Sequence, residues 1–226
     1  MKRHEHPGLF IAVEGLDGSG SSIQSTLLAG VLEKEGYRVV LTKEPTTNLI
    51  GGLIRAQLSK EWEAAGPDTL QILFTADRAH HLHREILPAL EAGKIVISDR
   101  YAFSSIAYGS IDVKDQEWLK QLNAQFILPD LTFLIQVRPK ICAIRMKESH
   151  YEVELYDEEQ KLTKVWNAYE TLAKIYSGVH TIHGERGELE ILHEMKELVL
   201  RALAGANGRL QLTKNNKGLT RTSCFD

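Results

Sequence analysis

The sequence predicts an α/β fold, a five-stranded parallel sheet with helices on both faces. Short apolar runs rich in β-branched residues alternate with long amphipathic stretches, which is the pattern of repeated strand–helix units. Several runs are almost continuously apolar, as expected for strands that are buried on both faces. A glycine-rich segment, Gly15 to Ser22, follows the first run and leads into a helical stretch. Ligands of such a sheet bind at the carboxyl ends of its strands.

Each element follows from the local pattern of apolar and turn-forming residues. The apolar runs predict strands over 9–14, 38–42, 94–98, 131–137 and 179–183. Apolar residues at helical spacing predict helices over 21–35, 49–60, 68–92, 115–124, 139–148, 157–176 and 188–203. Gly36 and Gly93 lie where two of these helices should end before a strand. Residues 205–226 are rich in Gly, Asn, Lys and Thr without apolar periodicity, so we expect a flexible C-terminal tail.

The composition excludes several classes of protein. At 226 residues and 43% apolar, the chain suits one α/β domain. Its 27 basic and 30 acidic residues give a net charge of −3, so we expect no nucleic-acid partner. Cys142 and Cys224 are too few for a disulfide framework or a cysteine metal site. The first apolar run is too short for a signal peptide, and no stretch is long enough to span a membrane, which predicts a cytoplasmic protein without a membrane partner.

The glycine-rich segment has the spacing of a phosphate-binding loop. It fits the pattern G-x-x-x-x-G-K-[ST] at every defined position except one, because Ser21 stands in the lysine position. Successive backbone N–H groups and the helix N-terminus behind them would point at an anion. The predicted ATP and phosphate ligands in this loop are Gly15, Leu16, Asp17, Gly18, Ser19, Gly20, Ser21 and Ser22. The motif predicts nucleotide binding, and the missing lysine raises the question of whether the protein catalyses a reaction.

A cluster of three histidines, His80, His81 and His83, lies in the predicted helix 68–92. His80 and His83 are neighbours on a helix at i, i+3, but no paired carboxylate or second histidine motif supports a zinc site. We therefore interpret the cluster as a solvated helix face.

Further segments carry a resemblance to a known family. They are Thr42-Lys-Glu-Pro45, Leu53-Ile-Arg55, Phe74-Thr-Ala-Asp-Arg78, Ser98-Asp-Arg-Tyr101, Phe103-Ser-Ser-Ile-Ala-Tyr108 and Pro129-Asp-Leu-Thr. In this order and spacing they resemble thymidylate kinase over roughly residues 8–203. The resemblance implies a P-loop kinase fold with a small lid, and transfer of the γ-phosphoryl group of ATP to dTMP to give dTDP and ADP, a step of dTTP biosynthesis. It also implies a homodimer. We expect a single domain over 1–204, with the lid at about 146–157.

By resemblance, the acceptor dTMP is bound by residues from several of these segments. Arg100 and Arg55 would grip the acceptor phosphate, since a guanidinium fork suits a phosphate dianion. Phe74 would stack on thymine and Arg78 would hydrogen-bond the base, because the two are at i, i+4 and share a helix face. The remaining residues implied at the acceptor are Ser105 near the base edge, Tyr108 against the sugar 2′-position, Glu44 and Pro45 in the pocket wall, and Asp17 near the phosphate or sugar.

The resemblance also implies residues for ATP, the metal and catalysis. Arg145 would pack on adenine, while Ser22 and Asp99 would hold Mg²⁺ directly or through water. Thymidylate kinases carry a catalytic arginine in the phosphate loop or in the lid. Here the loop has Ser19 and the lid is acidic, so we expect Asp17, Arg100 and Lys147 as the catalytic set.

Three interpretations of Ser21 stay open. In the first, the enzyme is active and Lys43, Lys147 or Arg186 replaces the lost lysine. In the second, the protein is a catalytically impaired module that binds ATP and dTMP. In the third, the acceptor is another nucleoside monophosphate or a deoxynucleoside.

Overall fold

The computed structural model describes residues 1–59, 65–149, 155–205, 210 and 212. Its centre is a five-stranded, fully parallel sheet in the order β2-β3-β1-β4-β5. The strands are β1 Leu9–Gly15, β2 Val39–Lys43, β3 Ile95–Asp99, β4 Leu131–Gln136 and β5 Val179–His183. The predicted fold class and all five predicted strands are confirmed, because each apolar run forms a strand within one or two residues of its expected bounds.

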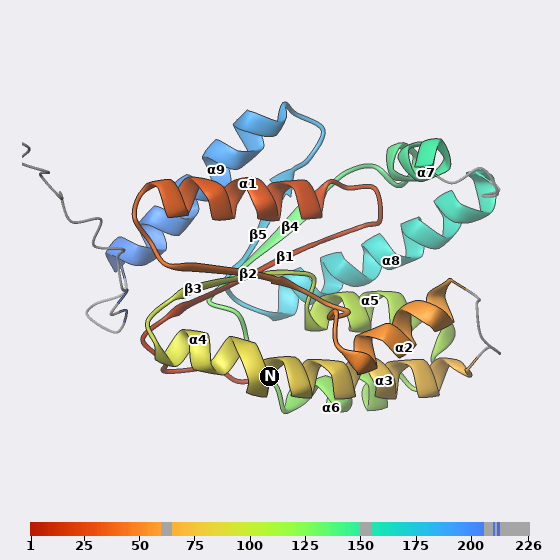
Figure 1. Ribbon diagram of the computed structural model, residues 1–226. Helices are drawn as coiled ribbons and strands as arrows, with labels where there is room; N and C mark the ends of the chain where they lie inside the picture. The colour runs from red at the N-terminus through yellow and green to blue at the C-terminus, as the bar shows by residue number, and fades with distance from the viewer. Residues whose placement is uncertain (60–64, 150–154, 206–209, 211, 213–226) are drawn as a thin grey trace, which may run out of the picture.

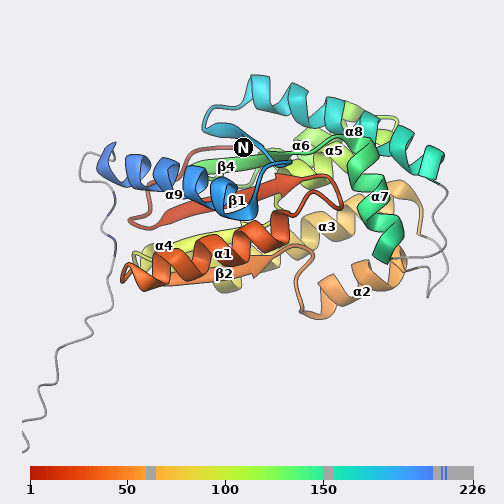
Figure 2. The ribbon, with the colours of Figure 1, turned by 90° about the horizontal axis from the view of Figure 1, so that it is seen from above.

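Helices cover both faces of the sheet (Figure 1). They are α1 Ser21–Lys34, α2 Leu49–Leu58, α3 Pro67–His81, η1 Leu82–Ile86, α4 Leu87–Glu91, α5 Ala102–Asp112, α6 Gln116–Ala124, α7 Pro139–Ser149, α8 Leu155–Ile175 and α9 Glu188–Gly205. Helices α1 and α9 pack on one face, and α4, α5 and α8 pack on the other. Seen from above, α2 and α7 lie at the end of the sheet to which β1 and β2 point (Figure 2).

The central strand β1 shows how sequence alternation builds the two layers. Every residue of β1 is buried, and its side chains alternate between the two faces. Ile11 belongs to the core cluster that includes Leu28 of α1, whereas Phe10 belongs to the cluster that includes Ile86 and Leu90. Burial on both faces fixes the register of β1, so the loop that follows Gly15 has a defined position between the layers.

Two features of the helical layer differ from the sequence prediction. Helix α5 was not predicted, because its Ser, Gly and aromatic residues are weak helix formers; packing against β1, α3 and α8 stabilises it. The predicted helix 68–92 is continuous in space but contains a π-helical turn, η1. Pro88 has no backbone N–H to donate to the preceding turn, which accounts for the altered hydrogen bonding just before it.

The predicted lid and tail are only partly described. Helix α7 reaches Ser149 and α8 begins at Leu155, so residues 150–154 of the expected lid lie outside the described residues. Most of the expected tail also lies outside them, but Leu210 and Leu212 are partly buried against the main core cluster. None of the described helices is both long and apolar enough to cross a bilayer.

Candidate active site

The loop between β1 and α1 has the backbone of an anion cradle. Gly18 and Gly20 have φ angles of +80° and +91°, a left-handed conformation that favours glycine. A Cβ on Gly18 would lie 2.8 Å from the carbonyl oxygen of Cys142, so α7 packs directly on the loop. Helix α1 begins at Ser21 with no acidic residue in its first turn. Its N-terminal N–H groups and its dipole are therefore available to a phosphate.

The predicted metal ligands meet at the start of α1. The Ser22 hydroxyl donates to Asp99 Oδ2 at 2.5 Å, and Asp99 Oδ1 is buried without a hydrogen-bond partner among the described residues. A hydroxyl and a carboxylate with a spare oxygen suit Mg²⁺, which prefers oxygen ligands and keeps several waters and phosphate oxygens. No cluster of three or more His, Cys, Asp or Glu side chains with metal-binding geometry occurs in the described part of the chain. The residues present therefore fit a Mg²⁺ ion that a nucleotide would bring.

Asp17, Arg100 and Tyr108 form one connected unit beside the loop. Arg100 Nη2 is 2.5 Å from Asp17 Oδ1, and the guanidinium lies 5.4 Å from the centre of the Tyr108 ring. The Tyr108 hydroxyl oxygen accepts the backbone N–H of Asp17 at 2.8 Å. Burial raises the pKa of the Tyr108 hydroxyl, so that the phenol stays neutral and can hold this contact over the physiological range. An acidic and a basic side chain thus face each other across the loop.

Arg100 has an unusual backbone. Its φ is +70°, in the left-handed region that non-glycine residues rarely adopt. The Arg100 N–H donates to the Val13 carbonyl at 2.9 Å, and the Ser98 hydroxyl donates to the Arg100 carbonyl at 2.7 Å. These contacts hold the turn after β3 in the conformation that directs the guanidinium toward Asp17.

A cavity of about 460 Å³, here called the Phe74 cavity, opens beside this unit. It brings together every residue that the resemblance implied for the acceptor nucleotide. Its lining includes Asp17, Glu44, Pro45, Arg55, Phe74, Arg78, Arg100, Ser105 and Tyr108, with Lys43, Leu58, Leu70, Gln71, Asp99, Tyr101, Ser104, Asp112 and Lys161. The residues come from α2, α3, α5, α8, the ends of β2 and β3 and the segments that follow β1, β2 and β3, so the cavity lies at the carboxyl end of the sheet.

Arg78 is the most deeply buried charged group of the Phe74 cavity. It is 1% exposed, and its guanidinium lies near the rings of Tyr101 and Phe126. Arg78 donates from Nε to Glu44 Oε2 at 2.9 Å, from Nη1 to Asn123 Oδ1 at 2.5 Å and from Nη2 to Ser105 Oγ at 2.8 Å. Nη2 is also 2.7 Å from Glu44 Oε2. Buried charges are tolerated when they are paired and hydrogen-bonded in this way, so the position of Arg78 is fixed by folding.

The two other predicted acceptor contacts are more accessible. Phe74 is only partly buried and lines the cavity, so its ring is not a core side chain. Arg55 is exposed and donates to the carbonyl oxygens of Thr46 and Pro45. One ring and one exposed cation therefore border the cavity.

Sequence reasoning missed a buried carboxylate under the loop. Glu14 is 1% exposed and accepts the Tyr101 N–H at 3.0 Å, the Ser104 hydroxyl at 2.5 Å and the Tyr169 hydroxyl at 3.2 Å. Burial raises the pKa of Glu14, although the hydrogen bond from Ser104 and the charges of Arg100 and Arg78 oppose this. A carboxylate inside an otherwise apolar strand was the signal that could have revealed it. Asn123 and Lys161 carried no comparable signal.

The interpretation of the histidine cluster was wrong for one residue. His83 is exposed, and His80, also exposed, contacts the Asn48 side chain at 3.0 Å. His81 is 2% exposed and lies between Glu44 and Glu85. It occupies the face of α3 that also carries Phe74 and Arg78, because it follows them at i+7 and i+3. That spacing could have assigned His81 to the site.

The candidate replacements for the missing lysine have different surroundings. Ser21 itself is buried, and its side chain is too short to cross the loop as a lysine side chain would. Lys43 lines the Phe74 cavity and also a second cavity of about 480 Å³, here called the Thr42 cavity, whose lining includes Ser22, Thr42, Glu85 and Asp99. No described residue forms an ion pair with Lys43.

The other cations are placed differently. Arg186 forms an ion pair with Glu194 and donates to the His183 carbonyl, and Lys147 is exposed on α7 and lines neither cavity. Arg145 donates from Nη1 to the Gly18 carbonyl at 3.1 Å, so its guanidinium lies against the loop.

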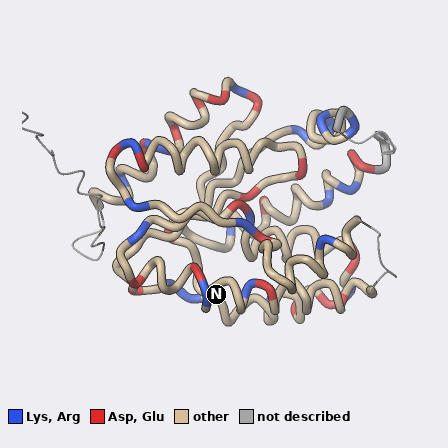
Figure 3. The backbone as a smooth tube through the Cα atoms, in the orientation of Figure 1, with Lys and Arg blue, Asp and Glu red and all other residues tan. Residues whose placement is uncertain are grey.

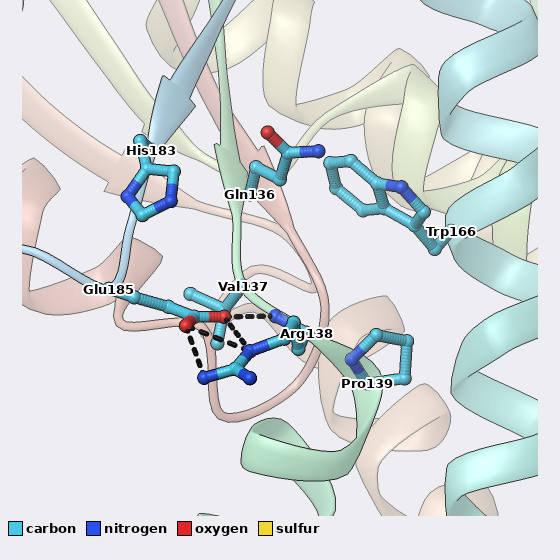
Figure 4. A pocket seen from close by; sticks show the side chains of 7 residues that line it. All are labelled: Gln136, Val137, Arg138, Pro139, Trp166, His183 and Glu185. Atoms are coloured by element: carbon cyan, nitrogen blue, oxygen red, sulfur yellow. Dashed lines mark hydrogen bonds and ion pairs between the residues drawn. The ribbon is translucent and has the colours of Figure 1, made fainter.

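A third cavity, of about 420 Å³, lies at the ends of β4 and β5. Its lining is Gln136, Val137, Arg138, Pro139, Trp166, His183 and Glu185, none of which the sequence singled out for acceptor, donor or metal. Figure 4 shows Glu185 joined to Arg138, with Trp166 approaching from α8. Acidic and basic residues are interspersed along the described backbone in Figure 3, in agreement with the mixed charge expected from composition.

Comparisons with known proteins agree with this geometry. The chain matches the sequence model of the thymidylate kinase family over residues 13–196. It is 38% identical over 207 residues to a probable thymidylate kinase of Thermococcus gammatolerans, covering 85% of this chain and 96% of the relative. A probable thymidylate kinase of Pyrococcus abyssi is 37% identical over 203 residues, 88% of this chain and 98% of the relative. A thymidylate kinase of Clavibacter michiganensis is 38% identical over 157 residues, 68% of this chain and 74% of the relative.

Proposed function

The chain belongs to the thymidylate kinase family and is therefore an ATP-dependent dTMP kinase, and we propose that dTMP binds in the Phe74 cavity beside the phosphate loop. One observation carries the proposal: every side chain implied for the acceptor lines this single cavity, at the carboxyl ends of β2 and β3. Its volume of about 460 Å³ is within the range of small-molecule sites. The loop after β1 forms its boundary through Asp17.

Thymine would be recognised by Phe74 and Arg78. A partly buried phenyl ring offers a face for stacking, and a guanidinium fixed by Glu44, Ser105 and Asn123 offers a donor that cannot reorient. A carbonyl oxygen of the base would satisfy that donor. Tyr108 is held against the loop by the Asp17 N–H and would close the space at the sugar 2′-position.

The acceptor phosphate would be held by Arg100 with Arg55. In the structure Arg100 is paired with Asp17, which lies 2.5 Å away and is nearly half exposed. A phosphate dianion would compete with Asp17 for the guanidinium, since charge-assisted bidentate bonds to phosphate are strong. An acceptor oxygen then attacks the γ-phosphorus as the bond to the β–γ bridging oxygen breaks, and ADP leaves.

Mg²⁺ would be held by Ser22 and Asp99, whose free Oδ1 supports the assignment. When bound, the ion neutralises phosphate oxygens in the transfer. The chain's own contribution is to fix Ser22 at the first turn of α1 and Asp99 at the end of β3.

For the donor, the loop Gly15–Ser22 would cradle the phosphates of ATP and Arg145 would pack on adenine. The contact of Arg145 with the Gly18 carbonyl supports a place for Arg145 beside the loop. Lys147 stays a prediction for the catalytic set, and it would act only if α7 moved, because it lines neither cavity.

We propose Lys43 as the cation that stands in for the missing loop lysine. It borders both the cavity with Ser22 and Asp99 and the cavity with Asp17 and Arg100, so it lies between the predicted metal site and the acceptor phosphate site. Loss of one close phosphate donor costs about 3 kcal/mol in a transition state, so an active enzyme needs a nearby substitute.

A double-mutant cycle tests this assignment. Lys43→Ala should lower kcat by about 10²-fold, as removal of a transition-state charge does. Ser21→Lys should make the loss of Lys43 much less costly, because the lysine would return to the loop. Lys174→Ala removes an exposed lysine that lines none of the three cavities and is the matched control. An unchanged kcat for Lys43→Ala would contradict the assignment.

The function itself is tested by ADP release from ATP and Mg²⁺ with dTMP, dUMP, UMP, CMP, dGMP or thymidine. Turnover specific to dTMP is the expected result, because the base and sugar contacts suit that acceptor. Tight binding of ATP and dTMP without ADP release would instead support an impaired binding module. Turnover only with another acceptor would move the assignment to that nucleotide or nucleoside.

The same proposal includes a homodimer in the cytoplasm. Helices α2 and α3 expose Leu49 and Ile72, which are apolar side chains that a helix-packed dimer could cover. Light scattering of the purified chain would give twice the mass of one 25.4 kDa chain.

A further inference from the structure

A chain of polar side chains lies beneath the Phe74 cavity, and its centre is His81. Nδ1 of the buried imidazole is 3.1 Å from Glu44 Oε1. Nε2 is 2.7 Å from Thr42 Oγ1 and 3.3 Å from Glu85 Oε2. These partners come from β2, the turn after it and η1, so His81 connects the end of β2 with the helix that carries Arg78.

The partners define the direction of the hydrogen bond to Glu44. A carboxylate accepts only, so His81 must donate from Nδ1 to Glu44 Oε1. On the other side, the Thr42 hydroxyl donates to Glu85 Oε2 at 2.9 Å and lies 2.7 Å from His81 Nε2. The Nδ1–H bond to Glu44 is therefore the contact through which His81 acts on the cavity.

Glu44 divides its two oxygens between two partners. Oε1 faces His81, while Oε2 accepts from Nε of Arg78 and lies 2.7 Å from its Nη2. The terminal torsion of a carboxylate has only weak intrinsic preferences, so its rotation is fixed by its partners. If Oε1 lost its donor, the carboxylate could turn away from Arg78, and the guanidinium would lose one of the three side chains that hold it in the cavity wall.

We propose that His81 is a positioning residue for acceptor recognition, which acts by holding Glu44 so that Glu44 holds Arg78 toward the base. The inference rests on the proposed function, in which Arg78 hydrogen-bonds thymine. It assigns a role to a residue that touches neither the acceptor nor the phosphates, since His81 does not line the Phe74 cavity.

Two amide substitutions separate the Nδ1 contact from the Nε2 contact. His81→Asn has an amide nitrogen close to the place of Nδ1 and keeps the bond to Glu44, whereas His81→Gln extends to the place of Nε2 and keeps the contacts with Thr42 and Glu85. We expect His81→Gln to raise the KM for dTMP by roughly tenfold, the effect of one lost hydrogen bond to a charged group. His81→Asn should leave this KM within about threefold of wild type.

The other kinetic parameters, kcat and the KM for ATP, distinguish a positioning role from a general loss of activity. Both variants should keep kcat and the KM for ATP within about threefold, because the phosphate loop and Arg100 are untouched. His83→Ala, which changes an exposed histidine of η1, is the matched control and should change none of these quantities. Urea unfolding of each variant would measure the cost to the fold separately.

The proposal would be overturned if His81→Asn and His81→Gln raised the KM for dTMP equally, or if the increases in KM followed the loss of stability. If His81→Gln does not fold, His81→Leu replaces it as the variant that fills the site without a donor. Calorimetric titration of the wild-type protein with dTMP separates failure of the proposed function from failure of this inference. Absence of dTMP binding by the wild type would reject the proposed function and this inference together. Normal binding by the wild type, with the same KM for dTMP in His81→Asn and His81→Gln, would reject the inference alone.

Discussion

The acceptor side and the donor side of the loop are built differently. On the acceptor side, Arg78 and Glu44 are buried, with 1% and 4% of their side chains exposed, and their partners are fixed during folding. On the donor side, the loop offers backbone N–H groups, and the cations near it, Lys43 and Arg145, are exposed. The proposed acceptor pocket is thus organised by the fold itself, whereas the proposed donor site gains most of its positive charge from exposed side chains.

This contrast indicates which part of the molecule sets each kind of specificity. A rigid buried donor discriminates between bases, because an unsuitable base would leave it unsatisfied. Flexible surface cations attract any polyphosphate and are screened by salt. Selectivity for the acceptor should therefore be robust to solution conditions, while the use of ATP should weaken as salt rises.

The largest effect should come from breaking the buried pair of the acceptor side. Arg78→Met keeps much of the side-chain volume but leaves Glu44 buried without its main cation. We expect the free energy of unfolding to fall by about 3–5 kcal/mol, as measured by urea denaturation.

Arg138→Met provides the matched control for this prediction. Arg138 also pairs with a carboxylate, Glu185, at 2.8 Å, but 74% of its side chain is exposed. Its removal should change stability far less than Arg78→Met. Similar losses for the two variants would contradict the contrast between a folded acceptor pocket and a solvated surface.

Next in size is Arg100→Ala, which removes the proposed clamp on the acceptor phosphate. We expect kcat/KM for dTMP to fall by about 10²–10³-fold, the cost of losing a charged donor in the transition state, with little change in ATP binding. Steady-state kinetics and nucleotide-binding titrations measure the two quantities. An equal loss of ATP affinity would place Arg100 on the donor side.

A smaller effect is expected from Tyr108→Ala, which should relax discrimination against UMP by roughly tenfold. The ring is the proposed obstacle at the sugar 2′-position, and its hydroxyl accepts the Asp17 N–H. Tyr108→Phe keeps the ring and removes the hydroxyl, so it should retain the discrimination. Competition assays with dTMP and UMP compare the variants, and unchanged selectivity in Tyr108→Ala would remove the ring from this role.

The smallest expected effect is that of Glu14, which is buried in β1 just before the phosphate loop. Its pKa is raised by burial, so the ionised form is disfavoured in the folded state. The contribution of Glu14 to stability is therefore present below its unfolded pKa and is lost as pH rises through the raised value. Relative to wild type, Glu14→Gln should therefore gain stability as pH rises from below the unfolded pKa of Glu14 through its raised folded value.

Urea unfolding at several pH values measures this trend, with the exposed Glu91→Gln as the control. A stability difference between Glu14→Gln and wild type that does not vary with pH would mean that Glu14 keeps an ordinary ionisation.

The sequence predicted the sheet because burial on both faces leaves continuous apolar runs, as in β1 and β3. It missed α5, since Ser104, Ser105 and Gly109 have low helix propensity and the helix depends on contacts distant in sequence. Helix boundaries at Gly36 and Gly93 were predictable, because both adopt the positive φ that ends a helix.

The candidate site was predictable where a motif or the family resemblance pointed to it. The glycine spacing predicted the loop, and the resemblance implied Phe74 and Arg78, which both line the Phe74 cavity. His81 was misassigned because three histidines close together suggest a polar surface, although its spacing from Arg78 indicates the buried face. The contact between Glu44 and His81 joins residues 37 positions apart, and no local pattern encodes it.

The left-handed backbone of Arg100 has a consequence for how this protein can evolve. Such a conformation costs a non-glycine residue roughly 1–2 kcal/mol, and glycine would adopt it freely. Selection for folding alone would favour glycine at this position, whereas selection for the proposed role of Arg100 in phosphate binding would favour the guanidinium. The two pressures oppose each other at a single codon. A lineage that no longer needed the reaction would therefore gain stability by replacing Arg100 with glycine.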